Sequence, residues 1–136
     1  MKEAGSFGSG IFYVEAGGFS MWPALRPGDR LIGMDCQPAK MGIGDIAVYE
    51  RGGILIAHRV VGRRGPTLLV TGDNSRGNPD AVEEKEIRGR VAGVVRGEKI
   101  IDLNSASARF TGALIALLAP VFTGAAKIMR KLNRRV

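Results

Sequence analysis

The sequence predicts a mostly β domain followed by a C-terminal helix. Twenty glycines and six prolines among 136 residues favour many turns and short strands over long helices. Runs of apolar, β-branched and aromatic residues recur between these turn residues, which is typical of a small, mostly antiparallel β domain. After Asn104 the apolar residues follow a helical spacing instead. A chain of this length with 45% hydrophobic residues is expected to form one domain with a modest core.

Seven strands are expected between residues 11 and 103, which form the body of the domain. The first is short and ends at Gly17-Gly18, and Gly52-Gly53 forms a hairpin-like connection into the longest one. Residues 1–10 carry an acid and several glycines instead of an apolar core, so we expect a flexible terminus with no signal peptide and no N-terminal anchor. The expected strands are 11–14, 30–34, 45–49, 54–61, 67–71, 87–95 and 99–103.

The C-terminal segment, residues 104–136, predicts a membrane-associated amphipathic helix. Residues 110–126 carry no charge, a length near the lower edge of the roughly 17 to 25 residues that a spanning helix needs. Pro120 interrupts this run, so a kinked helix on the membrane surface fits better than a span, with basic side chains reaching lipid phosphates. A helix that packs on its own domain or on a partner is the alternative.

Charge and composition narrow the classes of partner and site. The net charge is +7, but five positive charges lie in the last ten residues, which leaves the preceding 126 residues at +2. We therefore expect contact with a membrane surface through residues 105–136 and no nucleic-acid partner. One cysteine and one histidine exclude an internal disulfide and make a zinc site improbable, so no metal or cofactor is expected.

Ser20 is the candidate nucleophile. It follows Gly17-Gly18, and glycines let a substrate backbone approach closely, so Gly18 is a candidate for the oxyanion and substrate site. Met21 and Pro23 follow the serine and are expected to form an apolar rim for the substrate. A serine hydroxyl needs a base to become a nucleophile, and without one Ser20 is an ordinary turn serine.

His58 is the only histidine and therefore the only imidazole base available. Strand alternation places it on the same face as Ile56 and Val60, where a packed core histidine is the alternative. Asp73 and Asp80 are the candidate acids, since a carboxylate fixes the tautomer of such a base. A turn aspartate often only bonds its own backbone, and the sequence does not choose between the two.

Five ordered segments resemble the signal peptidase I superfamily of serine peptidases, in the branch that uses a histidine base. The resemblance covers about residues 17–95 and implies a coiled antiparallel β fold of signal-peptidase type. It also implies cleavage after small residues in an extended peptide, with the acid supplied by one of two aspartates in the segment 73–80. The matching segments are Ser20-Met21-Trp22-Pro23 with Gly28-Asp29, Gly44 to Tyr49, His58-Arg59-Val60-Val61, Gly72-Asp73-Asn74 and Gly89-Arg90-Val91.

The chain departs from the family pattern in three places. We expect no N-terminal transmembrane helix, Gly18 stands where some members use a serine hydroxyl for the oxyanion, and the domain is near minimal, without the large insertion of the bigger bacterial enzymes. In addition, Asp80 lies one residue further along than the usual spacing. The expected function is that of a serine endopeptidase acting on a leader peptide or a dedicated precursor. The alternatives are an inactive peptide-binding or scaffold module of the same fold, and a relative of the self-cleaving repressors, which use a lysine base.

Overall fold

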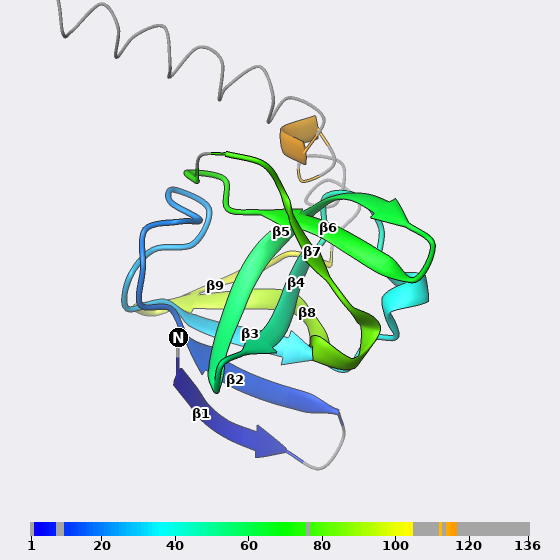
Figure 1. Ribbon diagram of the computed structural model, residues 1–136. Helices are drawn as coiled ribbons and strands as arrows, with labels where there is room; N and C mark the ends of the chain where they lie inside the picture. Colours follow the sequence, from blue (N-terminus) through cyan, green and yellow to red (C-terminus); the bar gives the residue numbers. More distant parts are fainter. Residues whose placement is uncertain (1, 8–9, 76, 105–111, 113, 117–136) are drawn as a thin grey trace, which may run out of the picture.

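A computed structural model of the chain describes residues 2–7, 10–75, 77–104, 112 and 114–116 (Figure 1). Within these residues nine antiparallel strands form one sheet in the order β1-β2-β3-β8-β4-β5-β6-β7, with β9 paired to β8. The mostly β class is therefore confirmed. The elements are β1 (Lys2–Phe7), β2 (Ile11–Glu15), β3 (Arg30–Met34), η1 (Pro38–Lys40), β4 (Ile46–Arg51), β5 (Ile54–Arg64), β6 (Thr67–Thr71), β7 (Asp80–Val82), η2 (Glu84–Glu86), β8 (Ile87–Arg96) and β9 (Lys99–Asp102).

The seven expected strands are present, and two further strands were missed. β1 pairs with β2 from Lys2 opposite Glu15 to Phe7 opposite Ile11, so the flexible terminus expected for residues 1–10 is wrong for residues 2–7. Its Gly, Ser and Ala residues have low strand propensity, and the ladder with β2 fixes its backbone instead. β7 pairs with β6, which places Asp80 on a strand and not in the expected loop.

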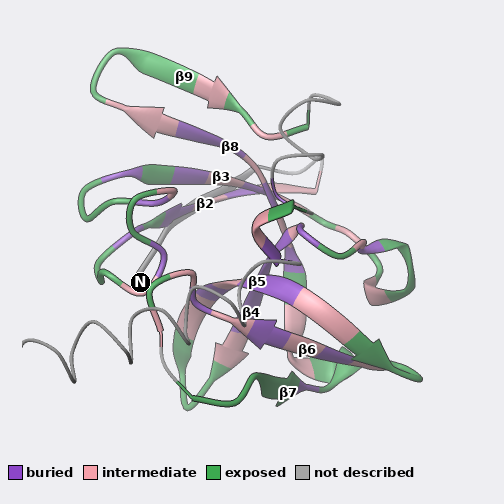
Figure 2. Cartoon of the chain, turned by 90° about the horizontal axis from the view of Figure 1, so that it is seen from above, coloured by how far each residue is buried: buried purple, intermediate pink, exposed green. Residues whose placement is uncertain are grey.

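β8 joins the two halves of the sheet. Its residues 90–95 pair with β3, while its other edge pairs with β4 through residues 87–90 and with β9 through residues 93–96. The strand therefore changes partners along its length, which coils the sheet and separates the β8–β9 hairpin from β6 and β7 (Figure 2). Gly89 lies where this bend brings β3 close, because a side chain at this position would collide with the carbonyl of Met34.

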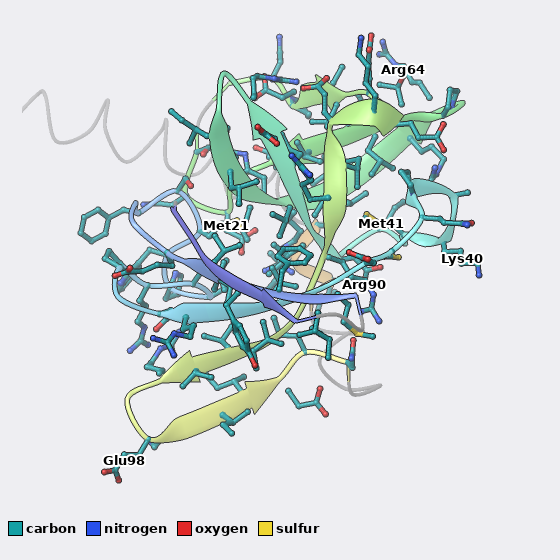
Figure 3. The ribbon with its side chains drawn as sticks, turned by 90° about the horizontal axis from the view of Figure 1, so that it is seen from below. Met21, Lys40, Met41, Arg64, Arg90 and Glu98 are labelled. Carbon is teal, nitrogen blue, oxygen red and sulfur yellow. The ribbon has the colours of Figure 1, made fainter. Side chains whose placement is uncertain are left out.

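Two clusters of buried side chains form the core, and each contributes to the site described below. Met21 belongs to the first and lies inside the strands in Figure 3, whereas Glu98 and Arg64 project from the periphery. Tyr49 belongs to the second. The first cluster is Phe12, Val14, Ala16, Met21, Leu25, Leu31, Ile46, Val48, Ala57, Val91 and Val94. The second is Met41, Ala47, Tyr49, Val60, Leu68, Val70 and Val82.

Two aspartates, Asp29 and Asp45, close the turns that lead into β3 and β4. The Asp29 carboxylate accepts a hydrogen bond of 2.8 Å from the backbone N–H of Arg26 and pairs with Arg96. The Asp45 carboxylate accepts one of 2.9 Å from the N–H of Gly42. Asp29 therefore fixes the backbone between the Ser20 turn and β3, which begins at the next residue, Arg30.

The expected C-terminal helix lies almost entirely outside the described residues. Gly112 and residues 114–116 are helical, and the rest of residues 105–136 is not described. Across the described part of the chain, no helix has the length and apolarity that crossing a membrane requires.

Candidate active site

Ser20 lies in a tight turn between β2 and β3. The N–H of Trp22 donates to the carbonyl of Phe19 at 3.0 Å, and the N–H of Leu25 donates to the carbonyl of Met21 at 2.9 Å. Met21 and Leu25 are each only 2% exposed, so their side chains fasten the turn to the first core cluster. Ser20 itself is partly exposed. The turn thus presents the serine hydroxyl from a backbone that the core holds in place.

A second loop, residues 72–75, holds the same turn through hydrogen bonds and a contact with Met21. The backbone N–H of Asn74 donates to the carbonyl of Ser20 at 2.7 Å, and its side-chain amide donates to the carbonyl of Phe19 at 3.3 Å. The N–H of Asp73 lies 3.4 Å from the Met21 sulfur. The Gly72-Asp73-Asn74 segment therefore positions Ser20 directly, a role that the sequence did not indicate.

His58 reaches Ser20 from β5. The Nε2 atom lies 3.2 Å from the Ser20 Oγ, which is within the looser range found for catalytic pairs without substrate. The structure thus brings together the predicted nucleophile and the predicted base, although 38 residues separate them in the chain. This pair can remove the serine proton and later return it, which is the chemistry of acyl transfer.

The side chain of Tyr49 occupies the other side of the imidazole. Its hydroxyl lies 3.2 Å from His58 Nδ1, and its ring meets the imidazole edge-on with centroids 6.1 Å apart. The hairpin register explains this contact: Ala47 lies opposite His58 on the neighbouring strand β4, so Tyr49 is a diagonal neighbour on the same face. Tyr49 was not among the predicted site residues, yet counting back from Gly52-Gly53 gives this register.

Asp73 does not bond His58. Both of its carboxylate oxygens accept hydrogen bonds of 2.7 Å from the Arg59 guanidinium, in a pair whose side chains are only 6% and 10% exposed. Arg59 follows His58 and points to the opposite face, and it lies opposite Thr71 in the β5–β6 ladder. The role expected for Asp73 as the acid beside the base is therefore corrected: it braces the loop that holds Ser20.

Asp80 also lies away from direct contact with the base. Its side chain is 60% exposed on β7, with an oxygen 3.9 Å from Arg51. Within the described residues neither candidate aspartate is hydrogen-bonded to His58, because their carboxylates turn toward arginines. Asp80 still acts on the imidazole through space: burial lowers the pKa of His58, and the negative charge of Asp80 opposes that shift.

Burial has the largest effect on the pKa of His58. Taking the imidazole out of water lowers the pKa of His58 from its ordinary value, and the negative charges of Asp80 and Asp73 oppose this shift. The net direction is downward, so His58 is a neutral base at pH 7. Burial likewise raises the pKa of Tyr49, assisted by the charge of Asp80, so this hydroxyl keeps its proton.

The predicted rim around Ser20 is partly wrong. Met21 is buried in the core and holds the turn from inside, whereas Pro23 is exposed as expected. The exposed aromatic surface comes instead from Phe19 and Trp22, which are 65% and 48% exposed. At Gly18 an added Cβ would meet nothing within 4 Å, so the space beside the nucleophile is open.

Comparison of the sequence with known protein families and with curated proteins finds no match. Within the described residues no group of His, Cys, Asp and Glu side chains is arranged to hold a metal ion.

Gly72→Ala is expected to disable the site. An added Cβ would collide with the Ser75 hydroxyl and lie 2.6 Å from the Ser20 carbonyl oxygen, so the Ser20 turn must move. A displacement of about 1 Å costs on the order of 100-fold in rate. We expect a loss of this size in the rate at which a fluorophosphonate probe labels Ser20. Gly62→Ala is the control, because its Cβ meets only Leu69 at 3.4 Å; an equal loss in both variants would contradict the account.

Proposed function

We propose that the protein is a serine endopeptidase of signal-peptidase type, with Ser20 as nucleophile and His58 as general base. The observation that carries the proposal is the 3.2 Å separation of Ser20 Oγ and His58 Nε2 on two elements that the core and a buried ion pair hold in place. The five ordered motifs that resemble the signal peptidase I superfamily support the same reaction.

The proposed reaction proceeds through an acyl-enzyme. His58 Nε2 takes the hydroxyl proton as Ser20 Oγ attacks the substrate carbonyl carbon, and the carbonyl oxygen becomes an oxyanion. The C–N bond then breaks, and the leaving amine takes the proton from Nε2. Water, deprotonated by the same nitrogen, then attacks the acyl carbon. The ester C–Oγ bond breaks, Ser20 Oγ takes the proton back from Nε2, and the new carboxyl group leaves. Each proton that His58 accepts is thus returned.

The oxyanion is assigned to backbone N–H groups, including that of Ser20. The open space at Gly18 supports this assignment, because a carbonyl oxygen can approach the turn there without meeting a side chain. Gly18 therefore remains in the proposed substrate site together with the exposed Pro23, whereas Met21 acts from within the core.

An extended peptide fits the strand that carries the base. β4 pairs with β5 along residues 54–59, whereas β6 pairs with β5 only from Arg59 onward. No ladder between described strands occupies the β6 side of residues 54–58, so the backbone next to His58 can accept a substrate strand there. The exposed rings of Phe19 and Trp22 favour an apolar substrate segment.

The proposed substrate is a leader peptide or a dedicated precursor, cleaved after small residues as the family resemblance implies. The proposed location is a membrane surface, contacted through residues 105–136. This part of the proposal depends on the uncharged run and the basic residues of the sequence.

The pH dependence of cleavage tests the proposal. Because burial lowers the pKa of His58, the acid limb of kcat/KM is expected below the ordinary histidine value of about 6.5. Activity falls as the pH decreases through this limb, since the imidazolium cannot accept the serine proton. The measurement is hydrolysis of an apolar fluorogenic peptide with small residues at the scissile bond, from about pH 4 to pH 8.

The lone histidine supplies an independent control for this profile. An NMR titration of the single imidazole gives its pKa without substrate, and the kinetic limb should coincide with it. A kinetic limb above 6.5, or one that does not follow the NMR titration, would contradict His58 as the base. Absence of any hydrolysis and of any labelling by serine-reactive probes would favour the inactive peptide-binding module.

A further inference from the structure

The imidazole of His58 has polar contacts on both ring nitrogens. Nε2 faces the Ser20 hydroxyl, and Nδ1 faces the Tyr49 hydroxyl, each at 3.2 Å. A carboxylate holds the second nitrogen in a Ser-His-Asp triad. Here the aspartates of the same region pair with arginines, and a neutral phenol stands at that nitrogen. The position that fixes the base is therefore filled by a residue of a different chemical class.

We propose that Tyr49 is the positioning residue of this site: its hydroxyl oxygen accepts a hydrogen bond from Nδ1–H of His58 and thereby keeps the Nε2 lone pair directed at Ser20. This inference rests on the proposed function, because the tautomer matters for catalysis only if His58 deprotonates Ser20. The geometry itself, a hydroxyl at Nδ1, does not depend on the reaction.

Tyr49 is well suited to hold the ring without moving. Its side chain is 1% exposed and packs in the second core cluster, and its ring contacts the edge of the imidazole. The Arg51 guanidinium lies over the Tyr49 ring, with its carbon 5.5 Å from the ring centroid. A buried aromatic side chain with few rotatable bonds defines the position of its hydroxyl closely, so the imidazole is preorganised before substrate binds.

The charges around this pair come from three further elements. Asp73 lies in the loop after β6, Asp80 lies on β7, and Glu86 belongs to η2, while Arg51 on β4 contacts the last two. Burial and the Asp80 charge keep the Tyr49 hydroxyl protonated by raising its pKa. Tyr49 thus orients the imidazole as a neutral acceptor, and the carboxylates act on the imidazolium only through space.

Tyr49→Phe tests the proposal, because it removes the hydroxyl and keeps the ring. The reaction measured is labelling by a fluorophosphonate, in which Ser20 Oγ attacks phosphorus and fluoride leaves. We expect the maximal labelling rate to fall by about 10- to 100-fold, the range expected when an ionised group loses one hydrogen bond. The concentration for half-maximal rate should stay unchanged, because the hydroxyl faces the base and not the probe. Tyr13→Phe, which removes the only other tyrosine hydroxyl, should label at the wild-type rate.

The tautomer of the lone histidine is a second readout that requires no activity. ¹⁵N-labelled histidine gives one pair of ring-nitrogen signals, because the chain has a single imidazole. In the wild type Nδ1 should carry the proton at neutral pH. In Tyr49→Phe the proton should move substantially to Nε2, which imidazoles prefer when no acceptor faces Nδ1.

The two readouts separate the possible failures. A proton on Nε2 in the wild type, or an unchanged tautomer in Tyr49→Phe, would overturn the role of Tyr49. An unchanged maximal labelling rate in that variant would also overturn it. If the wild-type protein is not labelled at all, the proposed peptidase function fails instead, and the NMR result still decides whether Tyr49 holds the ring. A variant with a lowered melting temperature but a wild-type tautomer would show a purely structural role and contradict the proposal.

Discussion

Ser20→Ala is expected to lower the kcat of peptide hydrolysis by about 10⁴-fold or more. In the proposed reaction the Ser20 hydroxyl oxygen forms the acyl-enzyme. A serine peptidase that loses its nucleophile retains only the catalysis that its oxyanion site and substrate binding supply. The fold should survive, because the turn is fixed by backbone hydrogen bonds and by the buried side chains of Met21 and Leu25. The measurement is product formation by mass analysis, together with a thermal melt of each protein.

Ser6→Ala is the matched control for this substitution. Ser6 lies on β1 at the edge of the sheet, opposite Phe12 in the ladder with β2, so removal of its hydroxyl tests only the general effect of losing a serine. We expect wild-type hydrolysis in this variant. Cleavage that persists in Ser20→Ala, in a preparation free of contaminating peptidases, would exclude Ser20 as the nucleophile.

Asp73→Ala is expected to lower the free energy of unfolding by about 3–5 kcal/mol. The substitution leaves the buried Arg59 guanidinium with the Gly44 carbonyl as its one remaining hydrogen-bond partner among the described residues, and an unpaired buried charge is costly. Gly112 packs against the same guanidinium, since an added Cβ there would lie 3.0 Å from Arg59 Nη1. For a domain of this size the melting temperature should fall by about 10 °C or more.

Two further variants identify the cause of this loss. Asp80→Ala removes an exposed carboxylate whose nearest arginine lies 3.9 Å away, so its stability should change by less than about 1 kcal/mol. Combining Arg59→Met with Asp73→Ala removes both buried charges and should recover part of the stability. An Asp73→Ala variant as stable as the wild type, with an altered histidine tautomer, would return Asp73 to the role of triad acid.

The sheet was largely predictable because glycines and prolines delimit its strands. The strands from β2 to β6, together with β8 and β9, follow from apolar runs between these turn residues. β1 and β7 were not predictable in this way, because they are short or poor in β-branched residues and depend on a neighbouring ladder. Tertiary pairing, which local sequence does not encode, decides such edge strands.

The candidate site was predictable to the extent that residue type restricts it. A single histidine left one imidazole base, and the structure places it against Ser20. The aspartates were misassigned because the sequence does not show which cation each carboxylate pairs with. In the structure the buried Arg59 guanidinium, and not His58, binds the Asp73 carboxylate. Tyr49 was not predicted because an aromatic residue in an apolar strand is expected to pack in the core. Tyr49 does pack there, in the second cluster, and it also contacts His58.

Covalent labelling tests the central claim, that His58 activates Ser20, most directly. A fluorophosphonate is incubated with the wild-type protein and with His58→Gln, and the modified residue is located by peptide mass mapping. The account predicts stoichiometric modification of Ser20 in the wild type, at a rate that rises with pH through the His58 titration, and labelling slower by at least about 100-fold in His58→Gln. Modification of another residue, or equal labelling of both proteins, would contradict it.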